Sequence, residues 1–409
     1  MYFYKKKQTL YMKLKKIVYL VFLCIGFQAG FSQQKIIDSL EQQIVTPTNG
    51  NSRFTNLVDL AHNYEFLNPK KGLELLEEAA NDTTQSRESV GYASFLAVKA
   101  SCYNNTGKDS LAITLYNQAQ KLFKKYGTNK DIALNLLNKG LMFSNQGKHK
   151  EQIELVKDAL KLYIIEKDTI QIVQCYERLG YSNTELGNYS KAMQSYLTAE
   201  DLNRLIHQEQ SLKNGSLQTN LALLYQRLYK PEIALEYHQK ALDIFKKNDH
   251  KYLTAISYHN MGTIYHESKK YKKALHTHIE SLNIGKEIKN IILISANLGS
   301  IGTAYLELDD LNLAMKYIDS AIAKTKEINN NYLLAINYNN KAEVFIKQNK
   351  HNKANQLLLR AISIAEKIGD KRMLISMKDL ASKASSGLGE FRKAYLLLDE
   401  VKMLNDSLL

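Results

Sequence analysis

A small residue returns at nearly constant intervals along this chain, and that register constrains the fold more than any other feature. It is clearest within residues 253–330, where Gly262 and Ala274 are followed forty residues later by Gly302 and Ala314. The full series of anchor residues is Gly72, Ala112, Gln152, Ala192, Ala234, Ala274, Ala314, Ala354 and Ala394, with steps of 40 residues and one of 42. A period of about 20–50 residues is typical of a solenoid, whose units pack mainly on their neighbours.

Each repeat contains two stretches with helical spacing. The first carries a small residue and usually an aromatic residue three positions later, as in Gly262 and Tyr265. The second carries the anchor, a bulky residue four positions later and usually a small one seven positions later, as in Ala192, Tyr196 and Ala199. Spacings of 3, 4 and 7 place these side chains on one helical stripe. With only three prolines in 409 residues, we predict an all-α solenoid of about nine helix pairs.

This pattern resembles the tetratricopeptide repeat over residues 53–409. It departs from that family in two respects: the proline at the end of the second helix is absent, and the period is 40 residues against roughly 34. The long repeats look like those of kinesin light chains, the LGN family and bacterial peptide-pheromone receptors. The resemblance implies a right-handed superhelix with a concave binding groove. Gln152 is the least typical anchor and predicts a looser joint, and the 42-residue step predicts a longer loop at 208–216.

Residues 1–32 have the pattern of an export signal. Six lysines and no acidic residue precede or flank a short apolar core at 17–26, and small residues before Gln33 allow cleavage there. An uncleaved membrane anchor is the alternative, although the apolar run is shorter than the roughly 20 residues that span a bilayer. Residues 33–52 are predicted to form a capping helix and a loop. We therefore expect an exported protein of the periplasm or cell envelope.

The remaining composition narrows the class of function. The net charge of +14 falls to +8 without the six lysines of residues 1–32. The sequence has no basic stripe interleaved with aromatic residues, the pattern that would predict a nucleic-acid partner. Cys102 and Cys175 lie on non-adjacent repeats, so two buried free thiols are expected. No catalytic motif, metal-ligand pattern or cofactor motif is present. His238 and His278 occupy the bulky packing position of their second helices; a core or surface role is predicted for the histidines, with metal binding or pH sensing as the alternative.

Asparagine recurs two residues before the small residue of the first helix. It stands at Asn138, Asn220, Asn260 and Asn340, whereas Lys99, Arg178 and Ser300 interrupt the series. An amide can donate to and accept from a peptide backbone at the same time, and the resemblance implies that this position lines the concave groove. Hydrogen bonds between adjacent repeats are the alternative role. Further candidate groove residues are Tyr181, His259, Thr263 and His266, together with Glu177, Thr219, Gln226, Asn339 and Glu343.

The sequence thus predicts a non-catalytic scaffold that binds a protein or peptide segment in its groove, with no small-molecule cofactor. The signal-like start and the repeats also resemble the extracytoplasmic sensor halves of Gram-negative regulators. Two alternatives follow: a shortened sensor module of a membrane-bound regulator, and a structural scaffold that self-assembles. Because a solenoid usually ends in a polar cap, association through the terminal repeats is a further expectation.

Overall fold

The computed structural model describes residues 32–45, 53–82 and 86–407, and the regular structure in these ranges is entirely helical. The all-α solenoid expected from the sequence is therefore confirmed. The predicted signal segment lies outside the described residues except for Ser32, as does the predicted loop at 46–52. No helix within the described ranges combines the length and apolar character that crossing a membrane requires.

The chain divides between Gln210 and Ser211 into two compact units, which are described separately. The N-terminal unit contains α2 (Ser32–Val45), α3 (Arg53–Tyr64), α4 (Pro69–Ala80), α5 (Val90–Asn105), α6 (Asp109–Tyr126), α7 (Asn129–Asn145), α8 (His149–Ile165), α9 (Thr169–Glu185) and α10 (Tyr189–Leu205). The C-terminal unit contains α11 (Leu212–Arg227), α12 (Pro231–Lys247), α13 (Lys251–Glu267), α14 (Tyr271–Glu287), α15 (Ile291–Glu307), α16 (Leu311–Glu327), α17 (Asn331–Lys347), α18 (His351–Ile368), α19 (Lys371–Gly387) and α20 (Phe391–Asp406).

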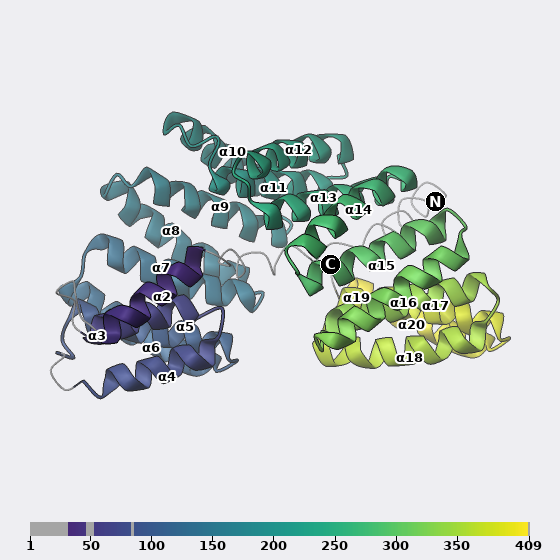
Figure 1. Ribbon diagram of the computed structural model, residues 1–409, viewed down its shortest axis with the longest axis horizontal. Helices are drawn as coiled ribbons and strands as arrows, with labels where there is room; N and C mark the ends of the chain where they lie inside the picture. Colours follow the sequence, from purple (N-terminus) through teal and green to yellow (C-terminus); the bar gives the residue numbers. More distant parts are fainter. Residues whose placement is uncertain (1–31, 46–52, 83–85, 408–409) are drawn as a thin grey trace. The chain divides into compact units, whose positions relative to one another are not determined.

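The forty-residue period follows from helix length. In the C-terminal unit α14, α15 and α16 are each 17 residues long, and three residues join each helix to the next. Two such helices with their two turns make one repeat. The middle residue of each turn is left-handed, Lys289 at φ 54° and Asp309 at φ 65°, which stops the helix and reverses the chain. Figure 1 shows the helices following one another as pairs.

The anchors lie where the two helices of a repeat cross. All nine are buried, and Gln152, which the sequence analysis took for a loose joint, is 2% exposed. Its Oε1 accepts a hydrogen bond of 2.6 Å from the hydroxyl of Ser182, on α9 of the following repeat. The joint at Gln152 is thus hydrogen-bonded across two helices, contrary to the sequence expectation.

The small residues of the first helices admit a bulky side chain from the second. A β-carbon on Gly302 of α15 would lie 2.5 Å from Cγ1 of Ile318 on α16, and one on Gly180 would lie 2.5 Å from Cε1 of Tyr196. Overpacking of this kind costs about 1–3 kcal/mol. The close approach at Gly302 therefore agrees with the packing role that the spacing predicts.

Within the C-terminal unit the first helices form one layer. α13 contacts α15, α15 contacts α17, and α17 contacts α19, in addition to the contacts within each repeat. Among the described residues, no comparably extensive contact joins consecutive second helices. The first helices approach one another more closely than the second helices do. A residue on the common face of the first helices therefore lies near its counterparts in the adjacent repeats.

The junction between the units is shorter than the sequence predicts. Helix α10 ends at Leu205 and α11 begins at Leu212, so residues 212–216 are helical although the composition of 208–216 suggests a loop. The hydroxyl of Ser211 accepts a hydrogen bond of 3.1 Å from the backbone N–H of Asn214 and caps the helix. This cap starts the helix inside a polar stretch.

Two cysteines of the described chain, Cys102 and Cys175, are free and buried, as predicted. Burial raises the pKa of each thiol to about 12, so both remain protonated at neutral pH. A protonated thiol is a poor nucleophile, and these cysteines act as small core side chains.

Candidate functional site

The predicted asparagine series falls on first helices of both units. Asn220 lies on α11, Asn260 on α13 and Asn340 on α17 of the C-terminal unit, and Asn138 lies on α7 of the N-terminal unit. In the C-terminal unit α15 lies between α13 and α17 and carries Ser300 at the equivalent place. Nδ2 of Asn340 is 3.9 Å from the position that a β-carbon would take on Gly299 of α15, so this amide lies against the neighbouring repeat.

These four asparagines form no side-chain hydrogen bond with any part of the chain that the structure describes. Asn138, Asn220 and Asn340 are half-buried. Asn260 is 7% exposed, and its buried Nδ2 has no hydrogen-bond partner. A buried donor without a partner costs about 1–3 kcal/mol. The amide of Asn260 is thus available to an acceptor that is not part of the described chain.

A second row of asparagines, which the sequence analysis missed, holds adjacent repeats together. Asn135, Asn297 and Asn337 precede the asparagine position by three residues and are almost fully buried. Nδ2 of Asn135 donates to the carbonyl oxygen of Tyr116 at 3.2 Å, and Nδ2 of Asn337 donates to Oγ1 of Thr325 at 3.0 Å. Each bond joins a first helix to the second helix of the preceding repeat.

Asn297 is the centre of a buried polar network in the C-terminal unit. Its Oδ1 is 2.9 Å from Nδ1 of His259 and 3.3 Å from Nδ1 of His278. Its Nδ2 donates to Oγ of Ser281 at 2.8 Å and to the carbonyl oxygen of Leu293 at 2.9 Å. The network connects α13, α14 and α15, and it gives His259 a partner within the fold.

Burial keeps the histidines of this region neutral. The pKa of His278 lies well below its ordinary value, chiefly because of burial and then because of the nearby His259. Burial also lowers the pKa of His259, and the hydrogen bond to Asn297 opposes that shift. His238 is fully buried and its pKa falls to about 3. The burial of His238 and His278 agrees with their place at the bulky packing position of the second helices.

The other candidate side chains contact their own or neighbouring helices. Thr263 is 5% exposed, and its hydroxyl donates to the carbonyl oxygen of His259 at 3.2 Å. The ring of His266 packs edge-on against Tyr271 with centroids 5.3 Å apart. The ring of Tyr181, on α9 of the N-terminal unit, packs edge-on against His149 at 5.7 Å. Of the predicted site residues, His259, Asn260, Thr263 and His266 all lie on α13.

Glu267 is a further unusual group that the sequence did not single out. Its Oε2 accepts a hydrogen bond of 2.8 Å from Nε2 of Gln226, which joins α13 to α11 across adjacent repeats. Burial raises the pKa of the Glu267 carboxyl to about 7, and the bond from Gln226 opposes the rise. This carboxyl therefore binds a proton more readily than an exposed glutamate does.

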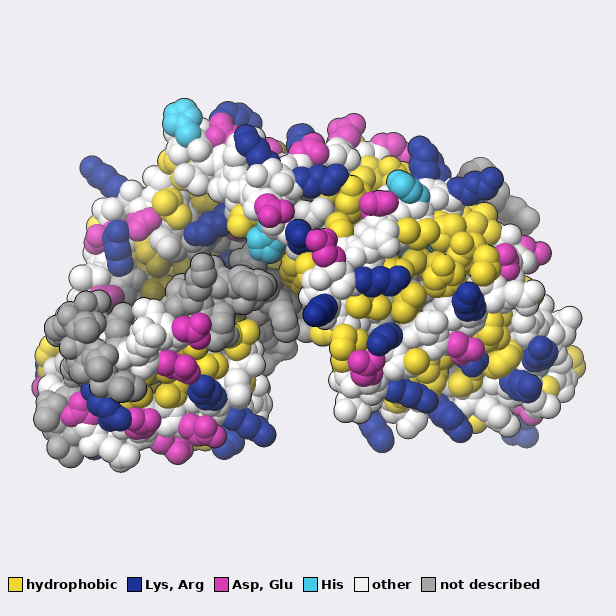
Figure 2. All heavy atoms as spheres, in the orientation of Figure 1, with side chains coloured by type: hydrophobic (Ala, Val, Ile, Leu, Met, Phe, Trp, Pro, Cys, Tyr) yellow, Lys and Arg dark blue, Asp and Glu magenta, His cyan; other side chains and the backbone are white. Residues whose placement is uncertain are grey.

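The surface around α15 is largely apolar. Figure 2 shows hydrophobic side chains gathered over the part of the C-terminal unit that carries the α15 label in Figure 1. Ile292, Ile294 and Leu298 of this helix are half-buried. Among the described residues, no group of three or more His, Cys, Asp or Glu side chains is arranged to hold a metal ion.

Two family models match within the chain. Both describe the tetratricopeptide repeat, one over residues 215–287 and the other over residues 173–204. The chain carries tetratricopeptide repeats. The longer match covers α12, α13 and α14, and with them the Asn297-linked histidines and Asn260.

Solved structures share the arrangement of these tetratricopeptide repeats at low identity. The apo form of RapI is 15% identical, with a TM-score of 0.64 over 87% of this chain and 98% of that chain. The apo form of the quorum sensor NprR from B. thuringiensis is 18% identical, with a TM-score of 0.62 over 85% and 97%. A Rap protein complexed with competence and sporulation factor is 14% identical, with a TM-score of 0.54 over 92% and 96%. No curated protein matches the chain. At these identities the likeness establishes the α-solenoid fold alone.

Proposed function

We propose that this chain is a non-catalytic tetratricopeptide-repeat protein that binds an extended protein or peptide segment. The contact face is the layer of first helices in the C-terminal unit, and Asn220, Asn260 and Asn340 hold the backbone of the ligand. One observation carries this proposal: these amides have no side-chain hydrogen-bond partner in the described chain, whereas the Nδ2 groups of Asn135, Asn297 and Asn337, one turn before the asparagine position, all donate to the preceding second helix. A structural role would require the opposite.

The chemistry of the amides suits an extended chain. An asparagine side chain can accept from a peptide N–H and donate to a peptide carbonyl. Asn260 is buried enough for such a bond to remove an unsatisfied donor, which favours the bound state. His259 and Thr263 contribute by holding α13 in place, since their polar atoms are engaged within the fold. The fold of a quorum sensor and that of a Rap protein bound to competence and sporulation factor also support this class of role.

The proposal is tested by binding to an array of short unstructured peptides, with the double variant Asn220→Ala, Asn260→Ala. We expect the wild-type chain to bind a subset of peptides and the double variant to lose that binding while circular dichroism stays unchanged. The matched control is Asn312→Ala, Asn352→Ala, which removes two exposed asparagines from second helices of the same unit. If the double variant unfolds, the amides are structural; if it binds as the wild type does, the proposed face is wrong.

A sensor module of a larger signalling protein is the second candidate. A solved structure from Pyrococcus horikoshii, described as a signal transduction ATPase with a tetratricopeptide repeat sensor, is 14% identical with a TM-score of 0.57, and this chain covers 65% of its length. In that case the same face binds the signal, and an output domain on the same or another polypeptide responds. Sequencing the coding region downstream separates the two candidates, because a sensor module requires an output domain to be encoded there or to co-purify.

Export of the protein is also part of this proposal. It rests on the lysine-rich start and short apolar core of residues 1–32. Cell fractionation followed by N-terminal sequencing tests it, and we expect a mature chain that begins at Gln33 in the periplasmic or envelope fraction. A chain that keeps residues 1–32 in the membrane fraction indicates the uncleaved anchor instead.

A further inference from the structure

The bulky residue that follows the anchor by four places is buried in the earlier repeats but exposed in the last one. The bulky residue four places after the anchor is at most 2% exposed in the eight earlier repeats, namely Leu76, Tyr116, Val156, Tyr196, His238, His278, Ile318 and Leu358. The equivalent residue on α20 is Leu398, and it is 47% exposed. In the described chain, nothing takes the place that the following repeat takes elsewhere.

The exposed residue belongs to a longer apolar stripe. Phe391, Tyr395 and Leu398 are spaced by four and three residues on α20 and therefore share one side of the helix. Phe391 is 71% exposed and Tyr395 is 70% exposed. Scattered exposed hydrophobic residues are ordinary, but three large ones in one stripe indicate a contact surface.

The preceding repeat shows what this side of a second helix normally meets. On α18 the equivalent residues are His351, Asn355 and Leu358, and the ring of His351 lies against Gly387 of α19. The stripe on α20 is thus the face that a second helix presents to a following first helix. Its partner should accordingly be a helix.

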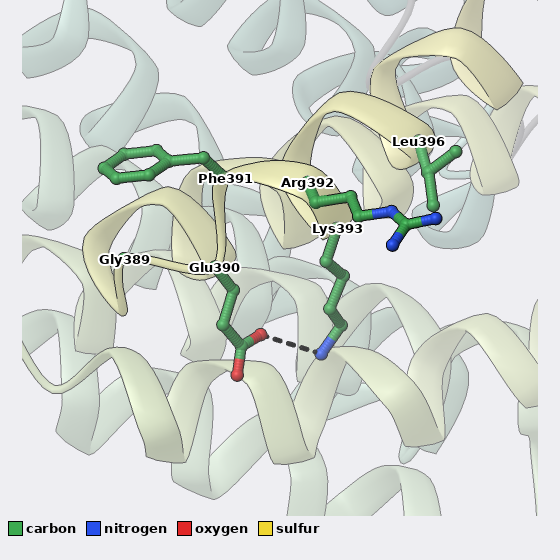
Figure 3. A pocket seen from close by; sticks show the side chains of 6 residues that line it. All are labelled: Gly389, Glu390, Phe391, Arg392, Lys393 and Leu396. Carbon is green, nitrogen blue, oxygen red and sulfur yellow. Dashed lines mark hydrogen bonds and ion pairs between the residues drawn. The ribbon is translucent and has the colours of Figure 1, made fainter.

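The charges beside the stripe indicate which helix. Arg392 and Asp399 are seven residues apart and lie on the same flank of α20. Both are exposed, and neither has an ion-pair partner among the described residues. On the opposite flank the charges are already engaged: Lys393 pairs with Glu390 at 3.1 Å, as Figure 3 shows, and Glu400 pairs with Lys378 of α19. The free flank carries one base near the start of the helix and one acid two turns later.

We propose that the stripe on α20 is the contact surface between two copies of this chain, with the two α20 helices packed in antiparallel orientation. A two-fold axis beside Tyr395 places Arg392 of each copy next to Asp399 of the other. The same axis brings Tyr395 and Leu398 of the two copies together and covers both stripes. A symmetric contact of this kind uses the same patch on both copies and closes at a dimer, so it does not propagate into a fibre.

Figure 3 shows the side chains around a surface pocket at the start of α20. Phe391 and Leu396 point away from each other, and a surface pocket of about 550 Å³ is lined by Gly389, Glu390, Phe391, Arg392, Lys393 and Leu396. A large side chain of the second copy can enter this pocket.

The test is sedimentation velocity of the full-length chain over a wide range of concentration. We expect a reversible monomer–dimer equilibrium. Tyr395→Glu should abolish the dimer without loss of helicity, since the side chain is 70% exposed. Arg392→Asp and Asp399→Arg should each weaken self-association by about tenfold or more, because each creates two like-charged contacts in a symmetric dimer. Lys367→Asp, a charge reversal on an exposed residue of α18, is the matched control and should leave the equilibrium unchanged.

Mixing the two single variants distinguishes this arrangement from any other. Arg392→Asp in one copy faces Asp399→Arg in the other, and the unchanged Asp399 and Arg392 face each other across the axis. The mixture should therefore form heterodimers as readily as the wild type dimerises. A monomer at every concentration means that the stripe meets another protein or a further segment of polypeptide, and the proposal is then wrong. A dimer that is insensitive to all three substitutions contradicts it equally.

Discussion

The imidazole ring of His278 lies directly over the α-carbon of Gly262, on the facing helix of the same repeat. A β-carbon on Gly262 would be 2.7 Å from Cε1 of the ring. The ring in turn is 3.3 Å from Oδ1 of Asn297 on α15, through its Nδ1. The absence of a side chain at one position thus lets α13 and α14 approach closely enough for a third helix to be joined to them.

Gly262→Ala should destabilise the C-terminal unit by about 1–3 kcal/mol, because the new methyl group overpacks the ring of His278. The gain in helix propensity, up to about 1 kcal/mol, offsets part of this loss. Gly285→Ala is the control, since its β-carbon would lie 3.4 Å from Leu293 and should leave stability equal or higher. Denaturant unfolding measures both, and an equal effect of the two substitutions would show that the ring contact is unimportant.

Asn297→Ala should cost about 1–3 kcal/mol in the free energy of unfolding, because it strands the buried ring nitrogens of two histidines. Asn260→Ala removes a buried donor that has no partner and should leave stability unchanged or slightly raised. Both substitutions delete an asparagine amide from a first helix of the same unit. A comparable loss in the free energy of unfolding in the two variants would mean that both rows of asparagines stabilise the fold to the same extent.

Acid should destabilise the C-terminal unit through His238. Its pKa is about 3 in the folded chain, and its ordinary value is 6.5, so the unfolded state binds the proton more strongly. Its contribution to stability is therefore complete above pH 6.5 and is lost as the pH falls toward 3, by up to about 1.4 kcal/mol per pH unit. His238→Leu should reduce the difference in stability between pH 7.5 and pH 5, whereas His276→Leu, at an exposed site, should not.

Glu267 should act in the opposite direction. Its pKa is about 7 in the folded chain against an ordinary value of 4.5, so the folded state binds the proton more strongly. The free energy of unfolding therefore falls as the pH rises from 4.5 to 7. Glu267→Gln keeps an acceptor for Gln226 and should be more stable than the wild type at pH 8, with little difference at pH 4. A variant that is less stable at pH 8 would show that the carboxylate is required.

The sequence predicted the architecture because the packing rule is local. The small size and regular spacing of Ala274, Gly302 and Ala314 predict close helix crossings. All three residues are buried in the structure, as a close crossing requires. Asn68 and Pro69 likewise indicate the turn before α4, where the Asn68 side chain caps the helix. The start of α11 was missed because one capping hydroxyl, that of Ser211, outweighs a polar and glycine-containing composition.

The candidate site was less accessible to sequence reasoning. Periodicity assigns His259 and Asn260 to neighbouring positions on α13, but it does not say that the imidazole turns to Asn297 while the amide is left without a partner. Asn135, Asn297 and Asn337 stand five residues before the small residue of their repeats, so the same alignment contained them. They were overlooked because an asparagine that bonds inside the fold looks, in sequence, like one that faces a ligand.

The row of asparagines that joins adjacent repeats and the row proposed to bind the ligand lie one helical turn apart. In the proposed function, substitution at 138, 220, 260, 300 or 340 alters what the face offers to a ligand, while the amides at 135, 297 and 337 still join adjacent repeats. The proposed binding positions can therefore be varied one repeat at a time without removing these hydrogen bonds between repeats. An engineer can use the same freedom, grafting a chosen side chain at Ser300 and leaving Asn297 untouched.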